Sequence, residues 1–387
     1  MLVVAGVFFL SGAATGQGGD TSTTLDLALD TLPPYIEPTT ILRAAVPTVP
    51  PTTISTTTTS TISPYATTGD LSGVCASIAK SPSQPDPPFV TTDPFTTSSA
   101  SAPTAVDPSA APNLSVAPVT TTVGASGSPT QNSTPTGCRL VAYYGNPNSP
   151  GLGPMGQSPA PQMLSALTAL TKRWQDADPQ TPTRCALQLI AVVAQGSPGV
   201  GSLYRGRASA ATINKVIGWG RERGCLTILD IQVGWSNVAA EVAYLERWLA
   251  MPDVHLALDP EWDMQPGVKP GSRIGTMSAA DINSAIEVLD RLAGANRLGP
   301  RLLIVHRFRS FMVTDPTTIK PTPNIRLVVN MDGFGPVPEK LSSYMVAQKG
   351  MPTRLTGMKL FFKLDRPLLG PIEVISLNPS PVFVNYQ

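Results

Sequence analysis

Short apolar runs alternate with amphipathic segments from residue 137 to the last residue of the chain. The apolar runs have the length of buried β-strands, and they lie at 139–144, 186–193, 226–232, 254–259, 301–306, 325–330, 358–362 and 382–386. Apolar residues that recur every three or four positions predict helices at 161–175, 209–223, 238–250 and 279–293. Ser278 is a suitable N-cap for the last of these helices.

This alternation extends over about 250 residues, the usual length of a parallel (β/α)8 barrel of the TIM type. Helix candidates after the fifth, sixth and seventh strands are short or weak. We therefore expect an α/β fold, with a (β/α)8 barrel at 137–387. The alternative is an open doubly wound sheet, which is disfavoured because no Gly-x-Gly-x-x-Gly motif follows the first predicted strand.

The residues before the barrel have a different composition. Residues 1–19 contain an apolar run followed by small residues, as in a signal peptide, and the run is too short to span a bilayer. Residues 20–136 are rich in Pro, Thr and Ser, and such a segment buries too little apolar surface to offset the entropy lost on ordering. We expect a disordered linker at 20–136, in a protein that is secreted or cell-wall associated and has no integral membrane domain.

Charge restricts the partners of this protein. Charged residues make up 14% of the chain, and the net charge is +1 at pH 7. A near-neutral chain offers no electrostatic reason to bind nucleic acid. We expect no nucleic-acid partner, and we expect the protein to be a monomer.

Four cysteines are compatible with an oxidising compartment. Cys75 lies in the predicted linker, while Cys138, Cys185 and Cys225 each precede a predicted strand. Parallel strands would bring these three to one end of the sheet. Cys185 can then pair with Cys225 or with Cys138, and three buried free thiols are an equal alternative.

Polar side chains follow the predicted strands, at the end of a parallel barrel where active sites lie. The fourth strand is followed by Asp259, Pro260, Glu261 and Trp262. Two carboxyl groups at this spacing on an extended chain project to one side, and their repulsion raises one pKa. Glycoside hydrolysis needs such a pair, with one acid as proton donor and one negative charge. Asp332, after the sixth strand, is a further candidate carboxylate.

Tyr143 and Tyr144 after the first strand, together with Asp259-x-Glu261 after the fourth, resemble family 18 glycoside hydrolases, the chitinase-like barrels. The chain also resembles secreted barrel proteins of actinobacteria. The family resemblance implies that Glu261 is the general acid and that Asp259 assists it. It also implies that the partner is a polysaccharide or cell-wall glycan.

The other strand ends provide candidate substrate-binding residues, and these are Tyr144, Asp230, Gln232, Trp235, Trp262 and His306. The arginines at 205, 207, 307 and 309 can bind an acidic group of a substrate or form a solvated rim. His255 lies early in its strand and is expected in the core. We expect no cofactor and no metal. Two alternatives stay open, a barrel that binds glycans without cleaving them and a metal-dependent hydrolase.

Overall fold

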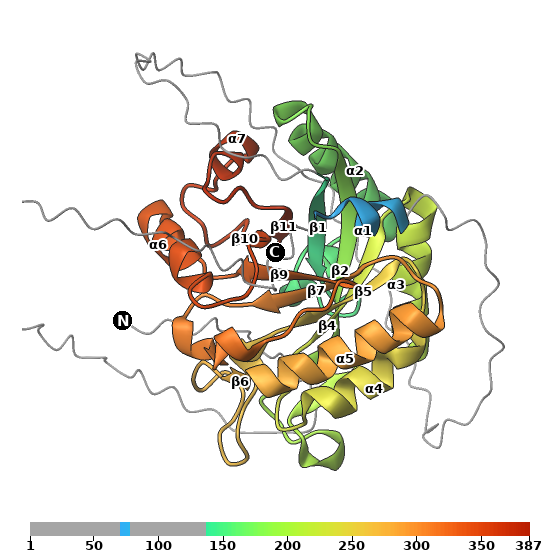
Figure 1. Cartoon of the computed structure of the whole chain (residues 1–387), viewed down its shortest axis with the longest axis vertical. Helices are drawn as coiled ribbons and strands as arrows, with labels where there is room; N and C mark the ends of the chain where they lie inside the picture. The colour runs from blue at the N-terminus through green and yellow to red at the C-terminus, as the bar shows by residue number, and fades with distance from the viewer. Residues whose placement is uncertain (1–69, 78–136) are drawn as a thin grey trace, which may run out of the picture. The chain divides into compact units, whose positions relative to one another are not determined.

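The computed structural model describes residues 70–77 and 137–387. Eight parallel strands form a closed barrel, since β1 pairs with β11 on one side and with β2 on the other (Figure 1). In chain order they are β1 (Arg139–Gly145), β2 (Thr183–Ala194), β4 (Leu226–Ile231), β5 (Val254–Leu258), β7 (Arg301–His306), β9 (Ile325–Met331), β10 (Thr356–Leu360) and β11 (Phe383–Tyr386). Every predicted strand is present, so the barrel prediction is confirmed and the open sheet is excluded.

Helices surround the barrel and connect most of its strands. They are α2 (Ala160–Ala177), α3 (Ala210–Arg223), α4 (Val238–Leu249), α5 (Ala279–Ala295), α6 (Val337–Ala347) and α7 (Pro371–Ile375). The Ser278 side chain accepts from the backbone N–H of Asp281, so the predicted N-cap of α5 is confirmed. The β7–β9 link instead contains two 3-10 turns, η6 (Ser310–Met312) and η7 (Pro316–Thr318).

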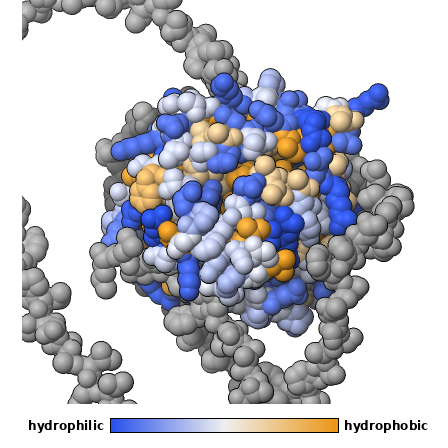
Figure 2. Space-filling model, turned by 90° about the horizontal axis from the view of Figure 1, so that it is seen from below, coloured by the Kyte–Doolittle hydropathy of each residue, from blue (hydrophilic) through white to orange (hydrophobic). Residues whose placement is uncertain are grey.

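Three short strands lie outside the barrel, β3 (Arg205–Arg207), β6 (Met277–Ser278) and β8 (Val313–Thr314). β3 runs antiparallel to β2, while β6 and β8 form a separate parallel pair. In Figure 2, hydrophilic and intermediate residues cover most of the visible face of the folded part, and apolar residues form small separate patches.

Alternate residues of each strand face the helices or the barrel interior. The outward layer packs against the helices, which contribute the buried indoles of Trp174 in α2 and Trp248 in α4 to the same apolar cluster. The interior is divided along its axis. Its N-terminal end holds an apolar cluster that includes Leu140, Ile304 and Phe383, whereas polar side chains occupy the end where the strands finish.

A short helix, α1 (Ser72–Ala76), lies within the predicted linker and belongs to the barrel domain. Leu71 and Val74 are fully buried in the apolar cluster at the N-terminal end of the barrel. A disulfide bond joins Cys75 to Cys138, the residue before β1. The linker predicted at 20–136 therefore contains an ordered segment. It is ordered because the apolar side chains of Leu71, Val74 and Cys75 pack on the apolar cluster at the end of the barrel. The rest of that linker and the signal-peptide-like segment at 1–19 lie outside the described residues.

A second disulfide bond joins Cys185 in β2 to Cys225 beside β4. This bond confirms the predicted pairing of Cys185 with Cys225 and excludes both the pairing of Cys185 with Cys138 and the free thiols. All four cysteines are disulfide-bonded, and none is a free thiol. Within residues 70–77 and 137–387, no helix is both long enough and apolar enough to cross a membrane.

Candidate active site

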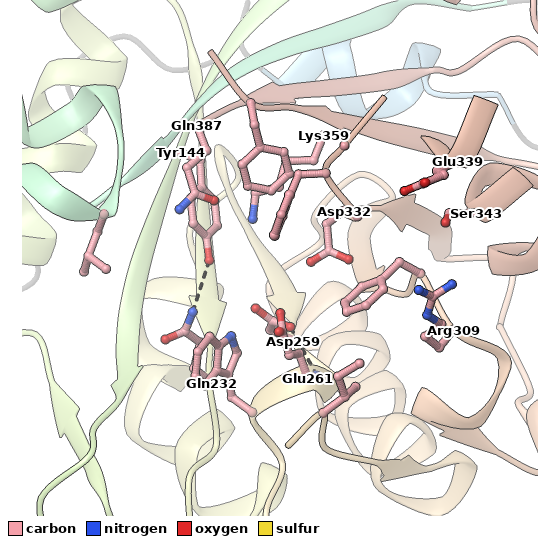
Figure 3. A pocket seen from close by; sticks show the side chains of 18 of the residues that line it. Tyr144, Gln232, Asp259, Glu261, Arg309, Asp332, Glu339, Ser343, Lys359 and Gln387 are labelled. Atoms are coloured by element: carbon pink, nitrogen blue, oxygen red, sulfur yellow. Dashed lines mark hydrogen bonds between the residues drawn. The ribbon is translucent and has the colours of Figure 1, made fainter. Parts of the chain in front are cut away.

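Three carboxylates meet at the C-terminal mouth of the barrel. Asp259 follows β5 and accepts a hydrogen bond from the backbone N–H of Glu261 at 3.3 Å. Glu261 lies in a 3-10 turn, η5 (Pro260–Trp262), rather than on the extended chain that the spacing suggested. Asp332 comes directly after β9. One carboxylate oxygen from each residue lies within 4.8 Å of the other two, and the three groups point toward one another in Figure 3.

These carboxylates line a cavity of about 470 Å³. Its volume is in the range of small-molecule sites, about 300–1,000 Å³. Aromatic side chains form much of its wall, and they are Tyr144, Trp262, Phe308, Phe334 and Phe361. Polar lining comes from Gln232, Arg309, Glu339, Ser342, Ser343, Lys359 and Gln387. Flat apolar rings among a few polar groups suit a sugar, which has apolar ring faces and hydroxyl edges.

Burial and mutual repulsion act on the acids of the cavity. Glu261 is 9% exposed, and burial, followed by the charges of Asp259 and Asp332, raises its pKa well above the ordinary value. Burial also raises the pKa of Asp259 to about 7; His306 opposes this rise, and Asp332 and Asp230 add to it. Both groups can therefore hold a proton near neutral pH.

His306 lies between two carboxylates and is fully buried. Its Nε2 lies 3.0 Å from Asp230 Oδ2, and its Nδ1 lies 3.1 Å from Asp332 Oδ2. Burial favours the neutral ring, but the two carboxylates outweigh it and raise the pKa of His306 to about 10. Burial alone would raise the pKa of Asp332. The charge and hydrogen bond of His306 outweigh burial and hold the pKa of Asp332 below its ordinary value.

Three amide side chains extend this polar layer below the cavity. Gln188 Nε2 donates to Asp230 Oδ2 at 2.6 Å, and Asn385 Nδ2 donates to Gln188 Oε1 at 2.8 Å. Asn330 Nδ2 donates to Asn385 Oδ1 at 3.1 Å. Buried polar groups are costly unless they are hydrogen-bonded, so this chain fixes the position of Asp230. Each amide lies in an otherwise apolar strand, and this was the one feature of the sequence that could have identified it.

Lys359 is another residue that the sequence reasoning missed. It is 3% exposed and lines the cavity, and its Nζ lies 3.6 Å from the centroid of the Tyr144 ring. Its positive charge lowers the pKa of Glu261 and Asp259, in opposition to burial. A lysine inside the otherwise apolar run 358–362 was the feature of the sequence that could have identified it.

The remaining predicted site residues divide into two groups. Tyr144, Gln232 and Trp262 line the cavity, where Gln232 Nε2 donates to the Tyr144 hydroxyl at 3.3 Å. Trp235, Asp230 and His306 do not line it. The Trp235 ring lies 4.0 Å from that of Tyr204 and its Nε1 donates to the carbonyl of Val268, whereas Asp230 and His306 bind each other below the cavity floor.

No model of a known protein family matches this chain, and no curated protein matches it. The barrel itself is established by its strand pairing. The resemblance to chitinase-like barrels therefore stays a prediction, and any function has to be argued from the chemistry of the cavity.

His255, the other histidine, lies away from this cavity. It is fully buried, and its Nδ1 accepts from the backbone N–H of Leu302 at 3.1 Å. Burial, helped by the charge of Arg301, lowers its pKa well below the ordinary value. His255 is therefore a neutral core residue, as its place in the sequence indicated.

Proposed function

We propose that this protein is a glycoside hydrolase in which Glu261 is the general acid and Asp332 is the second carboxylate. The observation that carries this proposal is that two acids lie close together in one cavity, where their surroundings shift their pKa values in opposite directions. The pKa of Glu261 is raised well above its ordinary value, whereas that of Asp332 is lowered. A pair of carboxyl groups with such different surroundings is typical of an acid and its charged partner.

The spacing of these groups favours retention of configuration. Carboxylate oxygens of Glu261 and Asp332 lie within 4.8 Å. Retaining glycosidases have carboxyl groups about 5–5.5 Å apart, while inverting ones need about 6.5–9.5 Å to admit a water molecule.

The reaction then has two steps. Glu261 donates its proton to the glycosidic oxygen, the bond from that oxygen to the anomeric carbon breaks, and a carboxylate oxygen of Asp332 bonds to the carbon. Water next attacks the same carbon. Glu261, now a carboxylate, takes the proton of the water, and the bond to Asp332 breaks. Asp259 assists by holding the backbone of Glu261 and by favouring its protonated form.

The substrate class follows from the cavity wall. Trp262, Phe308 and Phe361 line the cavity, and aromatic rings are side chains on which sugars stack. We propose an extracellular or cell-wall polysaccharide as substrate, for a protein that is secreted. The two disulfide bonds support an oxidising compartment.

The test uses Glu261→Gln and Asp332→Asn on a panel of polysaccharides, with product release measured by reducing-end assay and the product anomer by NMR. We expect both variants to lose at least about 10³-fold in turnover. The exposed Glu287→Gln in α5 is the matched control, because it removes a carboxyl group far from the cavity. Normal turnover by Glu261→Gln would rule out the assignment. Glycan binding without product by the native protein would favour a non-catalytic module instead.

A metal-dependent hydrolase is a second candidate, favoured by one observation. Asp259, Glu261 and Asp332 can each offer one oxygen to an ion within 4.8 Å of the others, and oxygen ligands suit Ca²⁺ or Mg²⁺. Turnover measured with and without a chelator separates the two candidates. Loss of turnover with the chelator, restored by the divalent ion, would favour this second candidate over acid catalysis by Glu261 alone.

A further inference from the structure

Four arginines come after the barrel strands β2 and β7, and the side chains of three of them bind other groups of the domain. Arg205 and Arg207 both bind Glu241, at 2.8 and 2.7 Å. Arg307 is buried and donates to three backbone carbonyls. Arg309 is the one that remains, and it is exposed.

Arg309 lines the cavity that holds the three carboxylates. Figure 3 shows its guanidinium on the same side as Glu339 and Ser343. Within residues 70–77 and 137–387 this guanidinium forms no ion pair or hydrogen bond, and it lies 5.9 Å from the centroid of the Phe308 ring. A guanidinium in a cavity wall presents a planar set of donors that matches a carboxylate.

A second cavity of about 430 Å³ adjoins the first, and Ile274 lines both. Its lining includes Arg273 and Phe311. Arg273 is exposed and, among the described residues, forms no ion pair or hydrogen bond. Phe311 is 53% exposed although it is large and apolar. The second cavity therefore resembles the first, because each is lined by an aromatic ring and by an arginine side chain without an ion pair to any described residue.

Two loops contribute lining residues to both cavities. The loop from Asp263 to Thr276 supplies Arg273 and Ile274, and the β7–β9 link supplies Arg309 and Phe311. Each of the two adjoining cavities thus offers at least one aromatic side chain and an exposed arginine. A single small sugar would occupy one cavity, whereas a polymer would occupy both.

We propose that the substrate is an acidic polysaccharide whose chain occupies both cavities, with Arg309 and Arg273 binding carboxylates of its sugars. The inference rests on the proposed function, because it names the class of glycan that the site takes.

The acids of the two cavities oppose such a substrate only in part. His306 contacts Asp332 directly and Lys359 adds a second positive charge. Glu339 is exposed to solvent, and burial raises the pKa of Asp263 in the second cavity to about 7.

The test measures binding separately from cleavage. Full-length Glu261→Gln protein is titrated calorimetrically with polygalacturonate, alginate and hyaluronan, each beside its carboxyl-reduced form and its disaccharide. We expect binding of at least one acidic polymer, at least about tenfold weaker binding of its reduced form, and weak binding of its disaccharide.

Arginine variants identify the groups responsible. Arg309→Gln and Arg273→Gln should each weaken binding of the acidic polymer about tenfold and leave the reduced form unaffected. Arg354→Gln is the matched control, since Arg354 is exposed and precedes β10 at the opposite end of the barrel. Equal binding of acidic and reduced polymers, unchanged affinity in both variants, or no binding of any acidic polymer would overturn the inference. Cleavage of a neutral glycan with loss in Glu261→Gln would then leave the proposed function standing.

Discussion

Asp259→Asn should stabilise the folded protein at pH 8. The Asp259 side chain is 1% exposed, and its pKa rises from an ordinary 3.8 to about 7 on folding. Each pH unit between these values corresponds to about 1.4 kcal/mol, so an ionised Asp259 lowers the free energy of unfolding by about 4 kcal/mol. Asparagine has the same shape, carries no charge and retains the oxygen that accepts from the Glu261 N–H.

The gain should depend on pH in a defined direction. Below pH 3.8 both the folded and unfolded protein hold the proton, and the variant and the native protein should then have similar stability. As the pH rises from 3.8 to about 7, the unfolded chain releases the proton while the folded protein keeps it. The free energy of unfolding of the native protein therefore falls relative to the variant over this interval and levels off above pH 7.

Urea unfolding of the full chain at several pH values between 4 and 8, with the disulfide bonds intact, measures this difference. Asp176→Asn is the matched control, since the Asp176 side chain is 59% exposed in a surface pair with Lys172 and should change stability by less than about 1 kcal/mol. The reasoning is refuted if the Asp259 variant is no more stable than the native protein at pH 8, or if its gain is the same at pH 4.

Three further outcomes can be measured. His306→Asn leaves two buried carboxylates without their positive partner, so urea unfolding at pH 7 should show a free energy of unfolding lower by about 3–5 kcal/mol. This difference should shrink as the pH approaches 10, because the native imidazolium then loses its proton. The double variant Cys75→Ser and Cys138→Ser opens a link across 63 residues and should lose about 4 kcal/mol in the same assay. Lys359→Met removes a positive charge that lowers the pKa of the site carboxyls, so both limbs of the pH–activity profile should move to higher pH.

Each of these outcomes has a result that contradicts it. Full stability of the His306 variant at pH 7 would mean that the carboxylates do not depend on the imidazolium. An unchanged unfolding midpoint for the cysteine double variant would show that the Cys75–Cys138 disulfide bond does not stabilise the domain. A pH profile that stays in place for the Lys359 variant would remove that ammonium from the electrostatics of the site.

The sequence by itself determined the barrel and the position of its acids along the chain. Burial on both faces requires continuous apolar runs in parallel strands, so all eight strands were visible as such runs. Their order also predicted that residues after the strands, such as Asp259, Glu261 and Asp332, would share one end of the barrel.

Only the tertiary structure decided which polar groups face one another. The sequence could not show that His306 lies between Asp230 and Asp332, because the three residues come from three different strands or strand ends and their angles depend on closure of the sheet. The α1 helix could not be predicted either, because it too depends on tertiary contacts. Three apolar residues are too few to predict a helix, and they form one here because the end of the barrel provides the surface that they cover.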